Sequence, residues 1–267
     1  MRDDHRQPVV WRTGLSVQAN VIGALLMREL HTRYGRENVG YLWLFLEPMM
    51  LGLTVGLLHL GSAVHFGSDI RPVPFAVVGY CIFIIFRGIF NRAEATLEAN
   101  RPLLYHRMVT IFDMLFARAL LEGAGVGITM MVLLVLSWAV GVGNLPARPV
   151  PLLAAALLMT WFSFAVSMLI CAGTHERRTA GRLVHPASYI LMPISGAFYV
   201  VEWLPEPYRT YVSWFPMTQI FELARYGQFA DSTTEYFHPV YVCLWCLVLT
   251  YLGMLSIRIT RRHVHLQ

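Results

Sequence analysis

Six long apolar runs dominate the 267-residue chain. A helix needs about 20 mostly apolar residues to cross a bilayer, and two of the runs are near the lower limit of that length. Only helices satisfy every backbone group in such runs, because the strands of a membrane barrel would alternate polar and apolar residues. The sequence therefore predicts an all-α polytopic membrane protein with six transmembrane helices. The runs cover residues 39–61, 73–90, 110–140, 150–173, 183–201 and 239–257.

The composition also indicates a chain embedded in lipid. Hydrophobic residues make up 56% of it and charged residues 14%, whereas a soluble domain carries roughly 25% charged residues. The four cysteines fall in or beside apolar runs, where small apolar filling is the simple interpretation and a metal or redox role is disfavoured.

All 21 basic residues are arginine, and their distribution predicts the orientation of the chain. Six precede residue 39, three lie in 91–109, three in 174–182 and three after 257. Only four lie in the connections expected on the opposite side: Arg71, Arg148, Arg209 and Arg225. The positive-inside rule places the arginine-rich side and both termini in the cytoplasm. This topology accounts for the net charge of +5 without a nucleic-acid partner.

Two segments outside the runs have unusual patterns. Residues 13–36 carry apolar side chains at steps of three or four, which predicts an amphipathic helix along the cytoplasmic interface; a helix of a small soluble cap is the alternative. Residues 199–237 hold eleven aromatics interrupted by prolines. They predict two short re-entrant helices at the outer interface, within 202–237, with a simple aromatic belt as the alternative.

Catalytic motifs are missing from the sequence. A nucleotide-binding P-loop requires a lysine, and the chain has none. It also lacks HExxH and GxSxG, and Ser195 has no convincing histidine partner for a serine protease. We therefore expect a protein that is not itself an enzyme, binds no metal or cofactor, and draws its energy from another subunit.

The apolar runs contain a few ionisable residues, namely Glu47, Arg87, Asp113, Arg118 and Glu122. Charges in a membrane are costly, so they should pair or face water. Arg118 and Glu122 are spaced to pair on one helix. Glu47 is expected to face the bundle interior near Arg118 or Arg87, with a purely structural ion pair as the alternative. Pro48 removes a backbone hydrogen bond and predicts a kink over 44–48.

Three blocks of sequence resemble a known family of transporters. They are RELHTRYGRENVGYLWLFLEP (28–48), FNRAEATLEANRPLLYHRMVTIFDMLFARAL (90–120) and PISGAFYVVEWLPEPYRTYVSWFPMTQIFELAR (193–225). Together they resemble the ABC-2 type permeases that export capsular polysaccharide or O-antigen, most closely the capsule-export permease. One departure is Phe215-Pro216, where Asn-Pro is more usual, and it leaves less hydrogen bonding at that turn.

The resemblance implies a single ABC-2 transmembrane domain over 1–267. It implies a homodimer that works with two copies of a separate ABC ATPase, which would bind ATP and Mg. A coupling helix over 91–107 and the 13–36 helix would rest on that ATPase, with Glu94, Glu98 and Arg101 as coupling residues.

The resemblance also implies a channel along the dimer interface, lined by aromatics of the first and fifth spans. Aromatic faces suit a hydrated glycan because they allow it to slide. The candidate lining residues are Tyr41, Trp43, Phe45, Glu47, Phe198, Tyr199 and Trp203. Arg33, Arg36 and Arg87 could hold a phosphate or acidic headgroup; binding ordinary lipid headgroups and setting the topology are the plainer roles.

The expected function is ATP-driven export of lipid-linked capsular polysaccharide across the bacterial inner membrane, together with a periplasmic envelope-export partner. Export of O-antigen or a teichoic-acid-type glycan is an alternative, as is export of a drug or small lipid by another ABC-2 permease. A membrane-embedded glycosyl- or acyltransferase and a structural adaptor are the alternatives from other classes.

Overall fold

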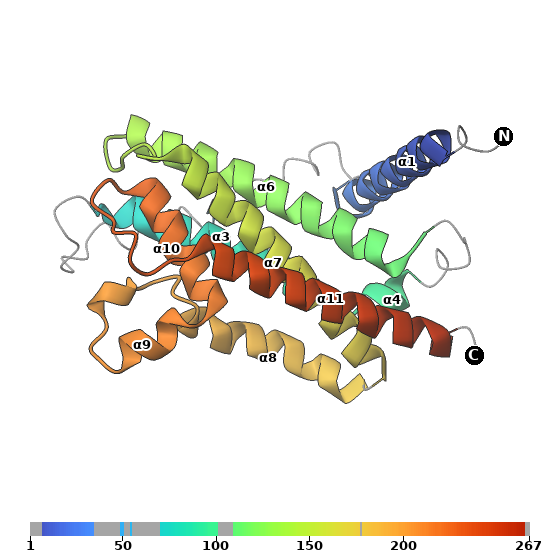
Figure 1. Cartoon of the computed structure of the whole chain (residues 1–267). Coiled ribbons are helices and arrows are strands. Elements are labelled where there is room, and N and C mark those ends of the chain that lie inside the picture. Colours follow the sequence, from blue (N-terminus) through green and yellow to red (C-terminus); the bar gives the residue numbers. More distant parts are fainter. Residues whose placement is uncertain are drawn as a thin grey trace, which may run out of the picture.

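The computed structural model describes residues 7–34, 49–50, 54, 70–100, 109–176 and 178–264. Every element in these ranges is a helix (Figure 1), which confirms the all-α class for the described residues. The elements are α1 (Gln7–Tyr34), α3 (Pro72–Ala93), α4 (Thr96–Ala99), α6 (Ile111–Ala139), α7 (Pro149–Glu176), α8 (Arg178–Ile194), the 3-10 helix η1 (Val201–Trp203), α9 (Tyr208–Ser213), α10 (Pro216–Gln228) and α11 (Pro239–Val264).

Four of these helices, α3, α6, α7 and α11, are long and apolar enough to cross a membrane. They coincide with the second, third, fourth and sixth apolar runs. The fifth run falls on α8, which has 17 residues, contains Pro186 and Pro193, and ends at Ile194. Nearly all of the first run and the kink expected over 44–48 lie outside the described residues.

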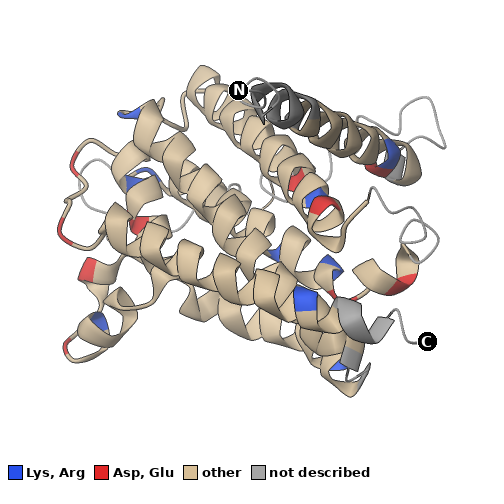
Figure 2. Ribbon diagram, turned by 45° about the vertical axis from the view of Figure 1, so that its right-hand side comes forward, with Lys and Arg blue, Asp and Glu red and all other residues tan. Residues whose placement is uncertain are grey.

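Helix α7 lies at the centre of the bundle and contacts α3, α6, α8, α10 and α11. In Figure 1, α4, the turn between α7 and α8, and the last turns of α11 lie together at the right-hand end of the bundle, which we call the α4 end. The α6–α7 connection and α9 lie at the opposite end, which we call the α9 end. Charged residues gather towards these two ends and leave the middle of the bundle largely uncharged (Figure 2).

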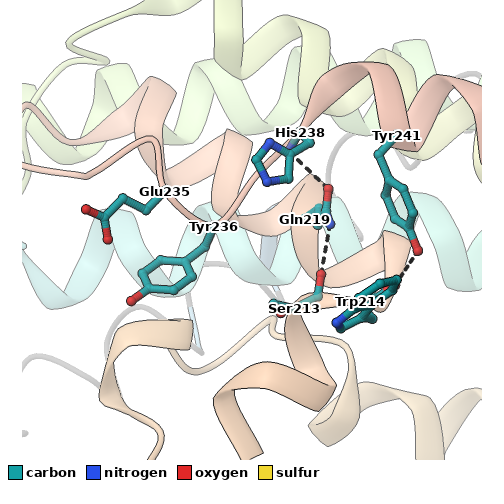
Figure 3. Close-up of a pocket in the computed structure, with 7 residues that line it drawn as sticks. All are labelled: Ser213, Trp214, Gln219, Glu235, Tyr236, His238 and Tyr241. Atoms are coloured by element: carbon teal, nitrogen blue, oxygen red, sulfur yellow. Dashed lines mark hydrogen bonds between the residues drawn. The ribbon is translucent and has the colours of Figure 1, made fainter.

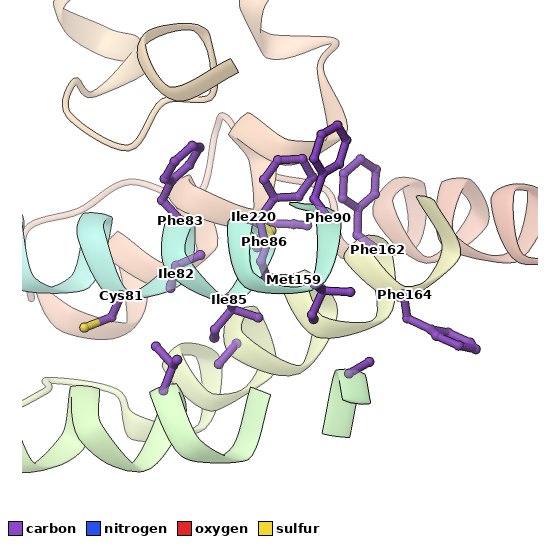
Figure 4. Packing of buried hydrophobic residues seen from close by; sticks show 14 of the residues in the cluster. Cys81, Ile82, Phe83, Ile85, Phe86, Phe90, Met159, Phe162, Phe164 and Ile220 are labelled. Atoms are coloured by element: carbon purple, nitrogen blue, oxygen red, sulfur yellow. The ribbon is translucent and has the colours of Figure 1, made fainter. Parts of the chain in front are cut away.

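The buried core centres on α3, whose most apolar stretch is 83% buried. The Phe86 ring lies 4.9 Å from Phe90 and 6.4 Å from Phe162 of α7, measured between ring centroids (Figure 4). A helix that is apolar on all sides is buried on all sides, and α3 is enclosed by α6, α7, α8 and α10. The corresponding stretch of α11 is only 17% buried, so most of its apolar surface faces outward.

Two segments outside the spans are partly as expected. Helix α1 begins at Gln7, before the expected start at residue 13, and packs on α6 through buried Leu25 and its neighbours. The 202–237 segment does contain two short helices, α9 and α10. Helix α10 starts at Pro216, a residue suited to a first helical turn, and is almost completely buried against α7 and α3.

Candidate functional site

A group of polar residues connects α1, α3, α4 and α6 at the α4 end. The guanidinium of Arg118 donates from Nε to Glu29 Oε1 at 3.0 Å and from Nη1 to Thr96 Oγ1 at 2.9 Å. Its Nη1 also donates to the backbone carbonyl of Arg92 at 3.1 Å, and Arg92 Nη1 lies 3.3 Å from Glu122 Oε1. We call these five residues the polar junction. One planar guanidinium thus joins three separate helices.

The sequence at the start of α6 fixes where this helix begins, and with it the position of the polar-junction residues Arg118 and Glu122 along the helix. Thr110 is the N-cap, and its hydroxyl accepts from the backbone N–H of Asp113 while Asp113 Oδ2 accepts from the N–H of Thr110 at 3.0 Å. This capping box fixes where α6 begins. Asp113 also accepts a hydrogen bond from the Gln18 side chain of α1, so the same carboxylate aligns the two helices.

Arg118 and Glu122, which the sequence spaces to pair on one helix, each have a partner on another helix: Arg118 bonds Glu29 and Glu122 lies beside Arg92. Long side chains on a helix lean towards its N-terminus, which for Arg118 is the α4 end, where Glu29 is available. Glu122 lies one turn deeper and packs beside Gly88 and Arg92. Glu47 lies outside the described residues, so its partner stays a prediction.

A cavity of about 300 Å³ lies beside the polar junction, between α4 and the turn from α7 to α8. Two of the three predicted coupling residues, Glu94 and Glu98, line it, and Arg101 lies outside the described residues. In place of one helix from residue 91, the end of α3 is followed by a turn and the four-residue α4. We call this cavity the α4 pocket; it is lined by Glu94, Ala95, Leu97, Glu98, Thr174, His175, Gly181 and Arg182.

The predicted channel residues of the fifth span follow α8 at the α9 end. Phe198 is half-buried against the core, and the Tyr199 hydroxyl donates to the carbonyl of Ile194 at 2.8 Å. Trp203 belongs to η1 and lies 5.6 Å from Phe75 between ring centroids. These three side chains therefore have different neighbours, and their role as a channel lining stays a prediction.

The remaining predicted site residues are only partly described. The Arg87 guanidinium lies over the Tyr189 ring of α8, 4.2 Å from its centroid, a cation–π geometry. Arg33 lies in α1, but its side chain is outside the description. The others also fall outside the described residues: Arg36, Tyr41, Trp43, Phe45 and Glu47.

Sequence reasoning missed a buried ion pair at the α9 end. Arg225 Nη1 lies 2.6 Å from Glu222 Oε1, and Arg225 also donates to the carbonyl of Gly196. Glu222 accepts from the backbone N–H of Val201 at 3.1 Å. The sequence interpretation assigned Arg225 to an external connection. The available signal was the three-residue spacing of opposite charges within an apolar amphipathic segment.

Residues 20–229 match the protein family described as ABC-2 type transporter. The chain belongs to the ABC-2 type transporter family. This match covers well over half of the sequence and confirms the resemblance drawn from the three sequence blocks. Family membership makes the chain a transporter membrane subunit and implies an ABC ATPase as its partner.

Several curated relatives of this ABC-2 protein carry names from capsule export. The capsule polysaccharide export inner-membrane protein CtrC of Neisseria meningitidis serogroup A is 40% identical over 240 residues, covering 90% of this chain and 91% of CtrC. The capsule polysaccharide export inner-membrane protein BexB of Haemophilus influenzae is 34% identical over 93% of this chain and 94% of BexB. The polysialic acid transport protein KpsM of Escherichia coli is 27% identical over 91% of this chain and 94% of KpsM.

Proposed function

We propose that this protein is the permease subunit of an ATP-driven exporter that moves lipid-linked capsular polysaccharide across the bacterial inner membrane. The observation that carries the proposal is the 40% identity to a capsule polysaccharide export inner-membrane protein over nine-tenths of both chains. The four apolar helices long enough to span a bilayer support a membrane location. Residues along almost the full length therefore contribute to the likeness.

The proposed topology has six crossings and both termini in the cytoplasm. The grouping of α4, the α7–α8 turn and the end of α11 at one end of the bundle supports it (Figure 1), because the connections there hold most of the arginines. In this arrangement α1 lies along the cytoplasmic interface, and α9 and α10 enter the membrane from the periplasmic side.

Two copies of a separate ABC ATPase would bind ATP and Mg and supply the energy. We place their contact at the α4 pocket, where Glu94 and Glu98 flank the short α4, together with Arg101. A displacement of α4 would act on the Arg118 guanidinium, because Arg118 is bonded to Thr96 of α4 and to Glu29 of α1. The polar junction would then pass the movement to α6.

A homodimer would complete the cargo path. Helix α8 leaves apolar and aromatic side chains strongly exposed, including Leu183 at 67%, Tyr189 at 58% and Ile190 at 63%. A second subunit across this face would enclose a path lined by aromatics of the first and fifth spans, including Phe198, Tyr199 and Trp203. A periplasmic envelope partner would receive the glycan beyond the α9 end.

The test is reconstitution of the permease with its ATPase in proteoliposomes. Lipid-linked capsular glycan should stimulate ATP hydrolysis and move across the bilayer, whereas the permease without the ATPase should do neither. Stimulation by hydrophobic drugs and not by the glycan would favour a drug or lipid exporter. Synthesis of a glycan product by the permease alone would indicate a transferase and contradict the proposal. O-antigen and teichoic-acid-type glycans, supplied in parallel, would separate the export alternatives.

A further inference from the structure

A second cavity, of about 470 Å³, opens at the α9 end between α9, α10 and the start of α11. Its size is within the roughly 300–1,000 Å³ range of small-molecule sites. Figure 3 shows the lining side chains arranged around the start of α11 and the α9–α10 turn. They are Ser213, Trp214, Gln219, Glu235, Tyr236, His238 and Tyr241, and we call this cavity the α9 pocket.

Hydrogen bonds hold the two walls of the α9 pocket together. The Gln219 side chain donates to the Ser213 carbonyl at 2.8 Å and accepts from the backbone N–H of His238 at 3.0 Å. The Tyr241 hydroxyl donates to the carbonyl of Trp214 at 2.8 Å. The α10–α11 side and the α9 side are therefore fixed to each other before any ligand arrives, which reduces the entropy that binding must overcome.

The lining combines aromatic faces with unused hydrogen-bonding groups. Trp214 is 68% exposed, and Tyr236 and Tyr241 are half-buried beside the cavity. Within the described part of the chain, the Glu235 carboxylate and the His238 imidazole have no hydrogen-bond partner. These are the groups that hydroxyl-rich ligands need, since a carboxylate accepts from hydroxyls and an imidazole can donate or accept.

The charge of the α9 pocket argues against an anionic ligand. The seven lining residues include no arginine or lysine, and one of them carries a carboxylate. An acidic sugar or phosphate would meet Glu235 without a compensating guanidinium, and like charges repel. The arginines nearest in sequence are engaged elsewhere: Arg209 with the carbonyls of Glu202 and Leu204, and Arg225 with Glu222.

We propose that the α9 pocket binds an uncharged sugar unit or an amino sugar of a glycan, with a ring face on Trp214 and hydroxyls on Glu235 and His238. This inference rests on the proposed function and assigns a sugar site outside the predicted Tyr199 and Trp203 region. Exposed aromatic rings favour the apolar face of a sugar, and the carboxylate sets the preference for neutral or cationic over acidic units. The site would hold the glycan at the periplasmic exit between successive cycles of ATP hydrolysis by the partner ATPase.

Binding should be measured on the complete complex with its ATPase in lipid nanodiscs, by saturation-transfer NMR and calorimetric titration. The probes are chitotetraose as a neutral amino-sugar oligomer, trigalacturonate as an acidic oligomer, and ethanolamine as a lipid-headgroup amine. Chitotetraose should bind, and Trp214→Ala should raise its dissociation constant about tenfold, the factor that corresponds to ~1.4 kcal/mol. Glu235→Gln should weaken the binding of chitotetraose and strengthen the binding of trigalacturonate. Trp214→Phe should keep part of the chitotetraose affinity that Trp214→Ala loses.

Matched controls separate the pocket from general effects. Trp138→Ala removes a tryptophan of α6 that is 53% exposed and does not line the cavity. Glu202→Gln removes an exposed carboxylate of η1 that likewise does not line the cavity. Both controls should bind chitotetraose like the unmodified protein.

Three results would overturn the inference: equal or tighter binding of trigalacturonate, tighter binding of ethanolamine, or unchanged chitotetraose binding in folded Trp214→Ala and Glu235→Gln complexes. If the unmodified complex still exports glycan in those cases, the proposed function stands and only the pocket assignment fails. If chitotetraose binds as expected but no glycan is exported by the complex, the pocket assignment stands and the proposed function fails.

Discussion

Arg118 of α6 donates to both carboxylate oxygens of Glu29 of α1, from Nε to Oε1 at 3.0 Å and from Nη2 to Oε2 at 3.4 Å. Both side chains are only 14% exposed, so this pair is shielded from water more than a surface salt bridge would be. Because Arg118 also bonds Thr96 and the carbonyl of Arg92, its loss would remove one polar contact of α6 to each of α1, α3 and α4.

The first prediction is that Glu29→Gln and Arg118→Gln each lower the free energy of unfolding by about 1.5–3 kcal/mol, the usual worth of hydrogen bonds to charged groups. Unfolding would be followed by tryptophan fluorescence during titration with a denaturing detergent. The double variant should lose less than the sum of the two, since each change removes the same interaction. Arg258→Gln on α11, an exposed arginine, is the control and should change little. If the double variant lost the full sum of the two single losses, the interaction between Glu29 and Arg118 would contribute nothing to the free energy of unfolding.

The second prediction concerns Gly181, which leaves room for Glu94 in the α4 pocket. A Cβ on Gly181 would lie 2.5 Å from Glu94 Oε1, the far end of a flexible side chain. Gly181→Ala should therefore displace the Glu94 carboxylate while stability stays within about 0.5 kcal/mol. If Glu94 couples the ATPase to the permease, glycan export per ATP hydrolysed should fall.

The measurement for Gly181→Ala is the ratio of exported glycan to hydrolysed ATP in proteoliposomes. Gly173→Ala, on the neighbouring α7, is a matched control because nothing lies within 4 Å of its added Cβ. If Gly181→Ala and Gly173→Ala gave the same ratio of exported glycan to hydrolysed ATP, the proposal that Glu94 couples the ATPase to the permease would be wrong.

The sequence was sufficient to locate the four helices that are long and apolar enough to span a bilayer, because the length of an apolar run sets where a helix can cross. It could not give the partners of the charges between helices. Glu29 and Arg118 are 89 positions apart, and their pairing depends on how α1 and α6 are rotated about their axes, which run lengths do not encode. The opposite charges of Glu222 and Arg225 are spaced three residues apart, which is suitable for pairing on a helix. The sequence interpretation nevertheless placed Arg225 in an external connection, where an exposed arginine was expected.

The glycines illustrate the same limit. The third run contains several glycines, yet only particular ones lie against a neighbouring helix. A Cβ on Gly123 would meet Thr160 Oγ1 of α7 at 2.4 Å, whereas one on Gly127 would meet nothing within 4 Å. The sequence contains the small residues, but only the packed bundle distinguishes the contact from open space.

The third prediction is that Gly79→Ala destabilises the bundle. Its Cβ would lie 2.1 Å from the carbonyl oxygen of Ala197, a backbone atom that cannot rotate away. Either α3 or the segment after α8 must shift, and such overpacking costs about 1–3 kcal/mol. The same detergent titration would measure the loss. Gly127→Ala is the control on α6 and should be neutral or slightly stabilising; equal effects of the two changes would contradict the close approach.

The last prediction concerns the Glu222–Arg225 pair, whose residues are 7% and 4% exposed. Arg225→Ala leaves Glu222 as an uncompensated buried charge and the Gly196 carbonyl without its donor, so it should cost about 3–5 kcal/mol of unfolding free energy. Changing both residues, as Glu222→Gln with Arg225→Met, removes the charge imbalance and should recover part of that loss.

A matched control for this pair lies on the surface nearby. Glu206 and Arg209 have the same three-residue spacing, with 4.0 Å between Arg209 Nε and Glu206 Oε1, and the Glu206 side chain is 59% exposed. Glu206→Gln should change the unfolding free energy by no more than about 0.5 kcal/mol, because solvent screens an exposed pair. If Arg225→Ala were as mild as Glu206→Gln, the buried pair would contribute nothing measurable to stability, and its bonds to Gly196 and Val201 would not hold α10 against the segment after α8.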